Sequence, residues 1–332
     1  MPIFRPAAAL YMVAAPAARA TTLLTLGTFH ERQGDQLLLD RPDSDPPGFT
    51  DVFDGSLAPI AWGRAFGETT QRTGTGPLAA SQRADIVGGE IGMDLAQFHL
   101  LAGDTDHVGA FYAYSHLSGD GDASVLGIID DLYGSLSLSA QNVGAYWSHI
   151  SQEGWYGDAV LMGSFYSETP KTPLDIVSDL SGHGITGSLE GGYPFPLTDT
   201  LELETQGQII WQSIGINNAI DPFTTVSFNS DNTIVGRFGL QLQDNLNVDG
   251  LLVQPRLILN LWHTFAGQDT TVYQSIIPIS ASFQSTTLEA GAGVATYLNK
   301  RLSAYVQASY TTNVDGSYVQ DIKGVFGLRY EW

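Results

Sequence analysis

Apolar and polar residues alternate along most of this chain, and the alternation is clearest in residues 201–212. One face of this segment carries Leu201, Leu203, Ile209 and Trp211, and the other carries Glu202, Glu204, Gln206, Gln208 and Gln212. Because the side chains of a β-strand repeat every two residues, the segment is predicted to be a strand with one apolar and one polar face. If both faces lay in a dry core, several carboxylates and amides would be buried without hydrogen-bond partners. The pattern therefore favours lipid on one side and water on the other.

The same alternation predicts twelve strands. They lie at residues 60–70, 84–98, 107–117, 137–150, 154–167, 182–193, 199–214, 232–244, 250–266, 283–297, 301–312 and 318–332. The connections between them alternate between long (118–136, 168–181, 215–231, 267–282) and short (151–153, 194–198, 245–249, 298–300). Long loops on one side and short turns on the other are typical of up-and-down barrels in bacterial outer membranes. A soluble sandwich with Greek-key connections is the alternative, and it does not produce so regular a series.

The last strand has the same two faces. Ile322, Phe326, Leu328, Tyr330 and Trp332 share one face, and Lys323, Arg329 and Glu331 share the other. In a transmembrane barrel the first face meets acyl chains and places aromatic rings at the membrane interface. A C-terminal aromatic of this kind is also what the barrel-assembly machinery reads, so Phe326, Leu328, Tyr330 and Trp332 are predicted to form the assembly signal.

Composition narrows the class further. No run of about 18 apolar residues exists to cross a bilayer as a helix. The 37 Gly, 14 Tyr, 15 Phe and 6 Trp suit short turns and two aromatic girdles, and the lack of Cys suits passage through an oxidising periplasm. The net charge of −21 argues against nucleic acid as a partner, because such binding needs a basic surface.

The predicted fold is all-β, a 12-stranded antiparallel up-and-down transmembrane β-barrel. Strands about 4.8 Å apart and tilted by about 40° give a barrel of roughly 24 Å, and inward side chains reduce the bore to about 10 Å. A bore of that size has room for one helix.

Several short motifs in order resemble the C-terminal translocator barrel of classical (type V) autotransporters. They are Phe4-Arg5-Pro6, His30-Glu31-Arg32-Gln33-Gly34, Trp62-Gly63-Arg64-Ala65-Phe66-Gly67, Gly154-Trp155-Tyr156-Gly157-Asp158, residues 203–211 and the Arg329-Tyr330-Glu331-Trp332 end. The resemblance covers nearly the whole chain. It implies that residues 60–332 are the barrel, that residues 1–59 are a linker, and that a helix over residues 16–32 fills the pore, with Pro16, Arg19, Leu23, Leu26 and Arg32 on it.

Physical arguments support this assignment in part. Pro16 is favourable in a first helical turn, and a helix over 16–32 would run about 25 Å, close to the apolar height of a barrel. Thr21, Thr22 and Thr25 are weaker helix formers, so packing in the lumen must supply order. The acidic, proline-containing stretch before residue 60 is predicted to be a solvated connector, in preference to a calcium site.

The polar strand faces predict how the helix is held in the lumen. Arg64 is expected to point inward and to pair with Glu204 or another inward carboxylate. The inward carboxylates of Glu90, Asp94, Glu202 and Glu204 are expected to meet Arg19 and Arg32 of the helix. Gln206 and Gln208 complete the predicted lumen lining.

Two other functions fit parts of the sequence. Residues 1–20, ending in Ala18-Arg19-Ala20, have the pattern of a secretory signal peptide, which would leave a small diffusion porin beginning near Thr21. His116 and His183 lie near strand ends beside serine and aspartate residues, where barrel hydrolases keep active sites. No triad, metal spacing or nucleotide motif accompanies them in the sequence, so neither an enzyme nor a cofactor is predicted.

The predicted function is therefore the translocator unit of an autotransporter, a pore and anchor for export of an N-terminal passenger that these residues do not encode. The predicted location is the outer membrane of a Gram-negative bacterium. The predicted partners are outer-membrane lipids, the barrel-assembly machinery and the passenger, and the predicted state is a monomer.

Overall fold

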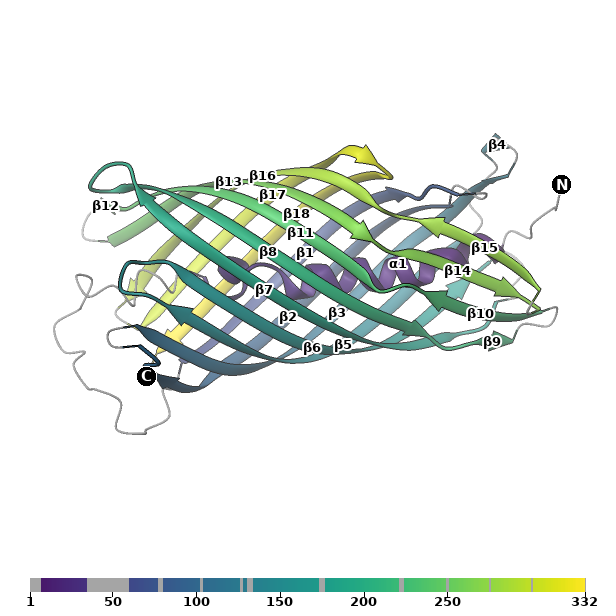
Figure 1. Ribbon diagram of the computed structural model, residues 1–332, viewed down its shortest axis with the longest axis horizontal. Coiled ribbons are helices and arrows are strands. Elements are labelled where there is room, and N and C mark those ends of the chain that lie inside the picture. The colour runs from purple at the N-terminus through teal and green to yellow at the C-terminus, as the bar shows by residue number, and fades with distance from the viewer. Residues whose placement is uncertain are drawn as a thin grey trace.

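Twelve long antiparallel strands form a closed barrel in the computed structural model (Figure 1). The structure describes residues 7–34, 60–76, 80–101, 104–125, 128–129, 134–172, 177–220, 224–248, 251–274, 276–299 and 301–331. The barrel strands are β1 (Ile60–Thr73), β2 (Ala80–Phe98), β3 (Thr105–Val125), β5 (Gly134–Ile150), β6 (Tyr156–Lys171), β7 (Leu180–Pro196), β8 (Leu201–Ile216), β11 (Thr233–Asp244), β13 (Leu251–Ala266), β16 (Ser285–Asn299), β17 (Leu302–Gly316) and β18 (Tyr318–Glu331). Each pairs with its neighbours along the chain, and β1 pairs with β18, which closes the ring. The predicted fold class is confirmed.

The two faces of each strand lie in different surroundings. On β8, Ile209 and Trp211 are exposed on the outer surface, whereas Glu204 and Gln212 are fully buried inside. On β18 the outer face carries Ile322, Phe326, Leu328 and Tyr330, all exposed, while Trp332 lies outside the described residues. The outer surface is thus the apolar face, as a barrel surrounded by lipid requires.

The two ends of the barrel differ. At one end, here called the long-loop end, the chain adds β4 (Ile128–Ile129), β9 (Ala219–Ile220), β10 (Thr225–Ser230), β14 (Gln268–Tyr273) and β15 (Ile277–Ser282). The last four form a second sheet in the order β15-β14-β10-β9, at the right of Figure 1. The opposite end, here called the short-turn end, carries β12 (Leu246–Val248) and the end of β18. The second sheet was not predicted, because its two halves lie in connections far apart in sequence.

Two helices lie inside the barrel, α1 (Ala7–Leu26) and α2 (Phe29–Gln33). The prediction of one helix over residues 16–32 is wrong at its start and in its continuity. The helix begins at Ala7, so Pro16 lies in its interior and removes an intrahelical hydrogen bond instead of starting the first turn. It stops at Leu26 because Gly27 turns the backbone to φ 61°, and Thr28 then caps α2. Among the described residues, no helix is long and apolar enough to cross a membrane.

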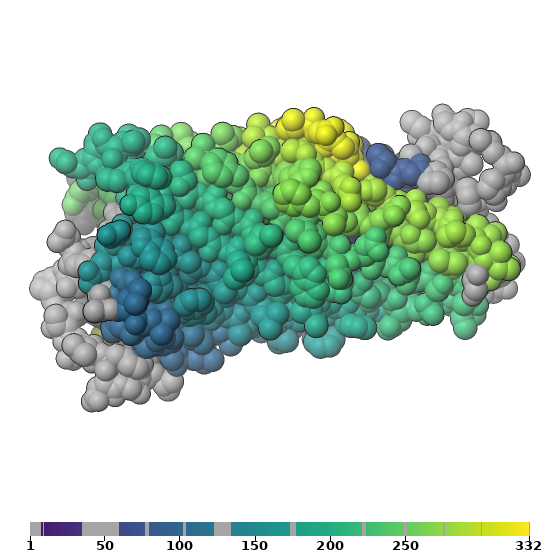
Figure 2. All heavy atoms as spheres, in the orientation of Figure 1, coloured from purple at the N-terminus to yellow at the C-terminus, as the bar shows by residue number. Residues whose placement is uncertain are grey.

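The core of the protein lies between these helices and the inner barrel wall. Around the first half of α1, at the long-loop end, the lumen is apolar, with Leu117, Leu136 and Leu138 packed against Tyr11 and Val13. Nearer the short-turn end it is polar. The barrel wall covers α1 in the view of Figure 2. Inward carboxylates that were expected to face water include Glu204, which is fully buried and lies beside His30 of α2.

Candidate functional site: the contacts between helices and barrel

Threonine hydroxyls in the second half of α1 form hydrogen bonds with the barrel wall. Thr22 Oγ1 donates to the Ala18 carbonyl and lies 2.6 Å from the Tyr166 hydroxyl of β6. Thr25 Oγ1 donates to the Thr21 carbonyl and lies 3.1 Å from Ser115 Oγ of β3. These residues lower helix propensity in solution, but here each buried hydroxyl has partners on the helix and on the wall. The barrel therefore provides the order that the helix sequence lacks.

Arg64 fixes the junction between α1 and α2. Its Nε donates to Glu90 Oε2 at 2.6 Å, and its Nη2 donates to the Thr25 carbonyl at the end of α1. The Arg64 and Glu90 side chains are both fully buried. Of the carboxylates predicted for Arg64, the structure selects Glu90 and not Glu204, because Glu90 lies directly opposite it on β2.

Helix α2 is bound on several sides. Its Thr28–Glu31 capping box satisfies the first turn internally, and the Phe29 amide donates to Glu190 of β7 at 2.9 Å. His30 Nε2 lies 2.8 Å from Glu204 of β8. The Phe29 ring stacks on Tyr156 of β6 with centroids 4.4 Å apart.

Charged contacts hold the other side of α2. Arg32 pairs with Asp158 of β6 at 2.7 Å, with both side chains 2% exposed. Glu31 pairs with Lys323 of β18 at 2.7 Å, and Lys323 also reaches Glu289 of β16 at 2.8 Å. A five-residue helix is thus bonded to β6, β7 and β8 on one side and to β18 on the other, so it cannot shift toward one wall without breaking buried pairs on the other.

The structure places the other predicted residues as follows. Arg19 pairs with Asp269 of β14, not with one of the four predicted strand carboxylates.

Asp94 accepts hydrogen bonds from His107 and Tyr146, and Glu202 accepts one from Gln243. Gln206 donates to Glu204, and Gln208 donates to the Gly27 carbonyl at 3.2 Å. Leu26 is buried at the end of α1, and Leu23 packs against the same apolar cluster. Of the predicted carboxylates, Glu90 lies close enough to Arg32 to interact with it electrostatically. The ion pairs of Arg32 and Arg19 form instead with Asp158 and Asp269, because strand tilt and helix rotation decide which inward carboxylate each arginine meets.

Arg237 of β11 is a contact residue that sequence reasoning missed. Its guanidinium pairs with Glu190 at 2.8 Å and donates to Gln206, Gln208 and Asn260 at 2.6–3.1 Å. It thereby holds in place the carboxylate that accepts from the Phe29 amide. The available signal was its position on the polar face of a predicted strand, which Asp158, Glu190 and Glu289 share.

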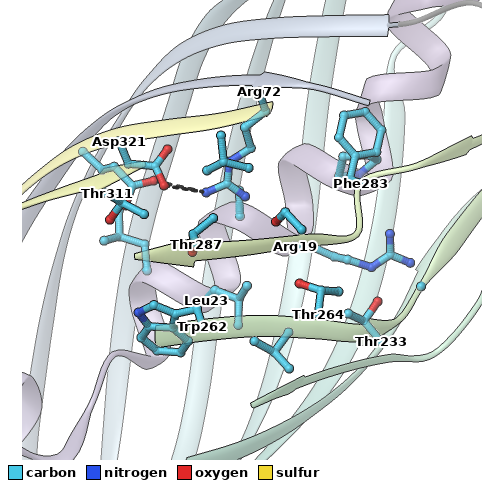
Figure 3. A pocket seen from close by; sticks show the side chains of 18 of the residues that line it. Arg19, Leu23, Arg72, Thr233, Trp262, Thr264, Phe283, Thr287, Thr311 and Asp321 are labelled. Atoms are coloured by element: carbon cyan, nitrogen blue, oxygen red, sulfur yellow. Dashed lines mark hydrogen bonds and ion pairs between the residues drawn. The ribbon is translucent and has the colours of Figure 1, made fainter. Parts of the chain in front are cut away.

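The helices do not fill the lumen evenly. Helix α1 packs mainly against β2, β3 and β5. On its other side a cavity of about 170 Å³ separates it from β13, β16 and β18. Figure 3 shows Arg19 and Leu23 on the helix side, with Trp262, Thr287 and the Arg72–Asp321 pair facing them. The Lys323 pairs with Glu31 and Glu289 border this cavity nearest α2.

The residues considered for hydrolysis do not assemble a site. Ser115 points into the lumen toward Thr25, whereas the neighbouring His116 lies on the other face of β3, 3.1 Å from Ser139. His183 of β7 is exposed on the outer face. No carboxylate is seen to orient either histidine among the described residues. Within those same residues no cluster of three or more His, Asp or Glu has the arrangement of a metal site.

Comparisons with known proteins agree with this geometry. A pertactin autotransporter of Bordetella bronchiseptica is 26% identical over 82% of this chain, and the alignment spans 29% of that relative's length. The transport unit of the autotransporter AIDA-I from Escherichia coli superposes with a TM-score of 0.72 at 15% identity, over 90% of this chain and 96% of that one. The β-domain of the Bordetella autotransporter BrkA superposes with a TM-score of 0.62 at 22% identity, over 83% of this chain and all of that one. The family model described as the autotransporter beta-domain matches residues 61–309. The chain therefore belongs to the autotransporter beta-domain family.

Proposed function

We propose that this chain is the membrane-embedded translocator of an autotransporter, serving as the export route and membrane anchor of a passenger joined to its N-terminal side. The chain is an outer-membrane β-barrel of a Gram-negative bacterium, as members of its family are. The single observation that carries the proposal is the path of α1 and α2. They run through the lumen from the long-loop end toward the short-turn end.

This path suits a chain that has been exported through or together with its barrel. Long loops face the cell exterior in bacterial barrels and short turns face the periplasm. A passenger preceding Ala7 would then emerge at the outer surface, while α2 stays bonded inside the lumen. Transport in this arrangement draws on folding and on the barrel-assembly machinery, a partner that we propose recognises the end of β18 through Phe326, Leu328, Tyr330 and Trp332.

Surface display tests the proposal. A secretion leader and a protease-sensitive reporter domain are fused before residue 1, and intact cells are treated with protease. We expect the reporter to be cleaved at the cell surface. The matched control ends at residue 317 and lacks β18, which pairs with both β1 and β17, so its barrel cannot close. Equal display by the truncated chain would contradict the proposal.

The N-terminus of the mature protein distinguishes the porin alternative. If residues 1–20 were a removed signal peptide, the barrel isolated from outer membranes would begin near Thr21 and would lose most of α1. Mass spectrometry of that material reads the terminus directly. A chain starting near Thr21 with high conductance in planar bilayers would support a porin, and retention of residues 7–20 would support the translocator.

A further inference from the structure

The cavity beside α1 is lined by more carboxylates than cations. Its acidic side chains, among the described residues, are Glu31, Glu68, Asp269, Glu289 and Asp321. Its cationic side chains in the same part of the chain are Arg19, Arg72 and Lys323. The carboxylates therefore exceed the cations of the lining, and a buried carboxylate without a cation of its own must take up either a proton or a bound cation.

On one side of the cavity, a single arginine is shared by two carboxylates (Figure 3). Arg72 Nη2 of β1 lies 3.5 Å from Glu68 Oε1 and 3.5 Å from Asp321 Oδ2 of β18. Both distances are longer than a charge-assisted hydrogen bond, and Glu68 Oε1 accepts no hydrogen bond from the residues that the structure describes. The Glu68 and Asp321 side chains are 9% and 8% exposed, so solvent does not neutralise the remaining charge. This side of the cavity can accept a further cation.

The other side offers hydrogen-bond acceptors that are not used. Gln212 of β8 is fully buried, and within the described part of the chain neither polar atom of its carboxamide has a partner. Thr233 lies opposite it on β11, is 3% exposed, and has a hydroxyl that likewise forms no hydrogen bond there. Asp269 bonds to Arg19 through Oδ2 and leaves Oδ1 without a partner among these residues. Asp269 is near Thr233, since a Cβ on Gly267 would lie 2.8 Å from Thr233 Oγ1.

The cavity also has an apolar lining. Leu23 and Leu24 contribute to it from α1, Val235 from β11 and Trp262 from β13. The cavity volume is about 170 Å³. A protein cavity of about 150 Å³ can hold benzene, which has roughly six heavy atoms. The space therefore suits a short carbon chain with polar ends.

We propose that this cavity binds a small aliphatic diamine. One ammonium group lies among Gln212, Thr233 and Asp269, and the other lies between Glu68 and Asp321. An ammonium group has three N–H donors and no acceptor, so it suits a place with several unused acceptors. The methylene chain then lies along the apolar lining, and the two charges compensate the excess carboxylates. The bound molecule fills the open side of α1 and holds the helix against β2, β3 and β5. This inference does not depend on export of a passenger.

The test uses the full chain folded from urea into uncharged detergent micelles with the amine present, so that entry into the lumen does not limit binding. The probe is putrescine, a four-carbon diamine, at neutral pH, with sodium chloride holding the ionic strength constant. We expect the midpoint of thermal unfolding to rise by about 2 °C or more. Butylamine should need about a ten-fold higher concentration for the same rise, because it lacks the second charge. Butanediol, which has no charge, should leave the midpoint unchanged.

Two variants test the two sides separately. Glu68→Gln removes a carboxylate and leaves Arg72 with Asp321, so putrescine and butylamine should then act at similar concentrations. Gln212→Leu removes an unpaired amide of similar size, and it should raise the putrescine concentration needed by about ten-fold. Glu153→Gln, at an exposed glutamate of a short turn, is the matched control and should respond as the wild type does. Because the two variants act on opposite sides, either one decides the question if the other fails to fold.

Three results would overturn the proposal. The first is a wild-type midpoint that putrescine does not raise. The second is an equal rise with butanediol, which would show that the charges are not recognised. The third is a folded Glu68→Gln or Gln212→Leu variant that responds to putrescine and butylamine as the wild type does, because the amine would then bind elsewhere on this acidic protein.

Discussion

The Arg32 guanidinium on α2 donates from one nitrogen to both carboxylate oxygens of Asp158 on β6, at 2.7 Å each. Both side chains are 2% exposed, so water screens neither charge. The Ser148 hydroxyl donates to the same carboxylate at 2.6 Å and holds it in place. This pair connects α2 to the barrel wall, and it is one of the buried contacts that keep α2 in the lumen.

Replacing Arg32 with alanine should weaken the protein substantially. Asp158 would keep its charge in a buried place without its partner, and we expect a loss of about 3–5 kcal/mol in the free energy of unfolding. Urea unfolding in micelles measures the change. The double variant Arg32→Met with Asp158→Asn should lose less than Arg32→Ala alone, because no buried charge remains. An equal or larger loss in the double variant would contradict a role for the ion pair.

Replacing Lys323 with glutamine should weaken the attachment of α2 to β18, on the side of the lumen that holds the cavity. Lys323 separates the carboxylates of Glu31 and Glu289, which lie 2.7 and 2.8 Å from its ammonium group, and without it they would repel each other. We expect a several-fold rise in single-channel conductance in planar bilayers, because the cavity beside α1 ends at this contact. Lys171→Gln, at an exposed lysine of the long-loop end, should leave conductance unchanged.

Replacing Gly27 with alanine should disturb the junction of the two helices. Gly27 has φ 61°, and an added Cβ would lie 2.6 Å from Arg64 Nη1. The left-handed backbone costs about 1–2 kcal/mol for alanine, and displacement of Arg64 from Thr25 adds to it. We expect a fall of about 2–3 kcal/mol in unfolding free energy. Gly163→Ala is the comparison, since no heavy atom would lie within 4 Å of its Cβ. A similar fall in unfolding free energy for Gly163→Ala would show that the effect at Gly27 does not come from its backbone conformation or from contact with Arg64.

Replacing Leu161 with arginine tests which surface meets lipid. Leu161 is 62% exposed on the outer face of β6, so an arginine there has room and would cost little if this surface faced water. In a bilayer an arginine near the midplane should cost about 2–4 kcal/mol. The free energy of folding into lipid vesicles, measured as a function of urea concentration, gives this cost. Glu153→Arg, in the exposed turn before β6, should cost almost nothing, and equal costs at the two sites would argue against a lipid-facing wall.

The barrel was predictable because its information is local. The alternation that puts Ile209 outside and Glu204 inside depends on the two-residue period of a strand, and closure follows once twelve such strands are joined by alternating long and short connections. The resemblance in ordered motifs then indicated a helix in the lumen. These inferences needed no knowledge of which strand residue faces which helix residue.

The contact partners were not predictable from sequence. Strand tilt, register and the turn at Gly27 decide that Arg64 meets Glu90, that Arg32 meets Asp158 and that Arg19 meets Asp269. The second sheet also depends on pairing between residues 225–230 and 268–273, which only folding brings together. The sequence by itself determined which side of each strand is apolar, since side-chain periodicity is a property of neighbouring residues. Only the tertiary structure decided how the lumen charges are neutralised, because the Coulomb energy depends on distances between segments far apart in the chain.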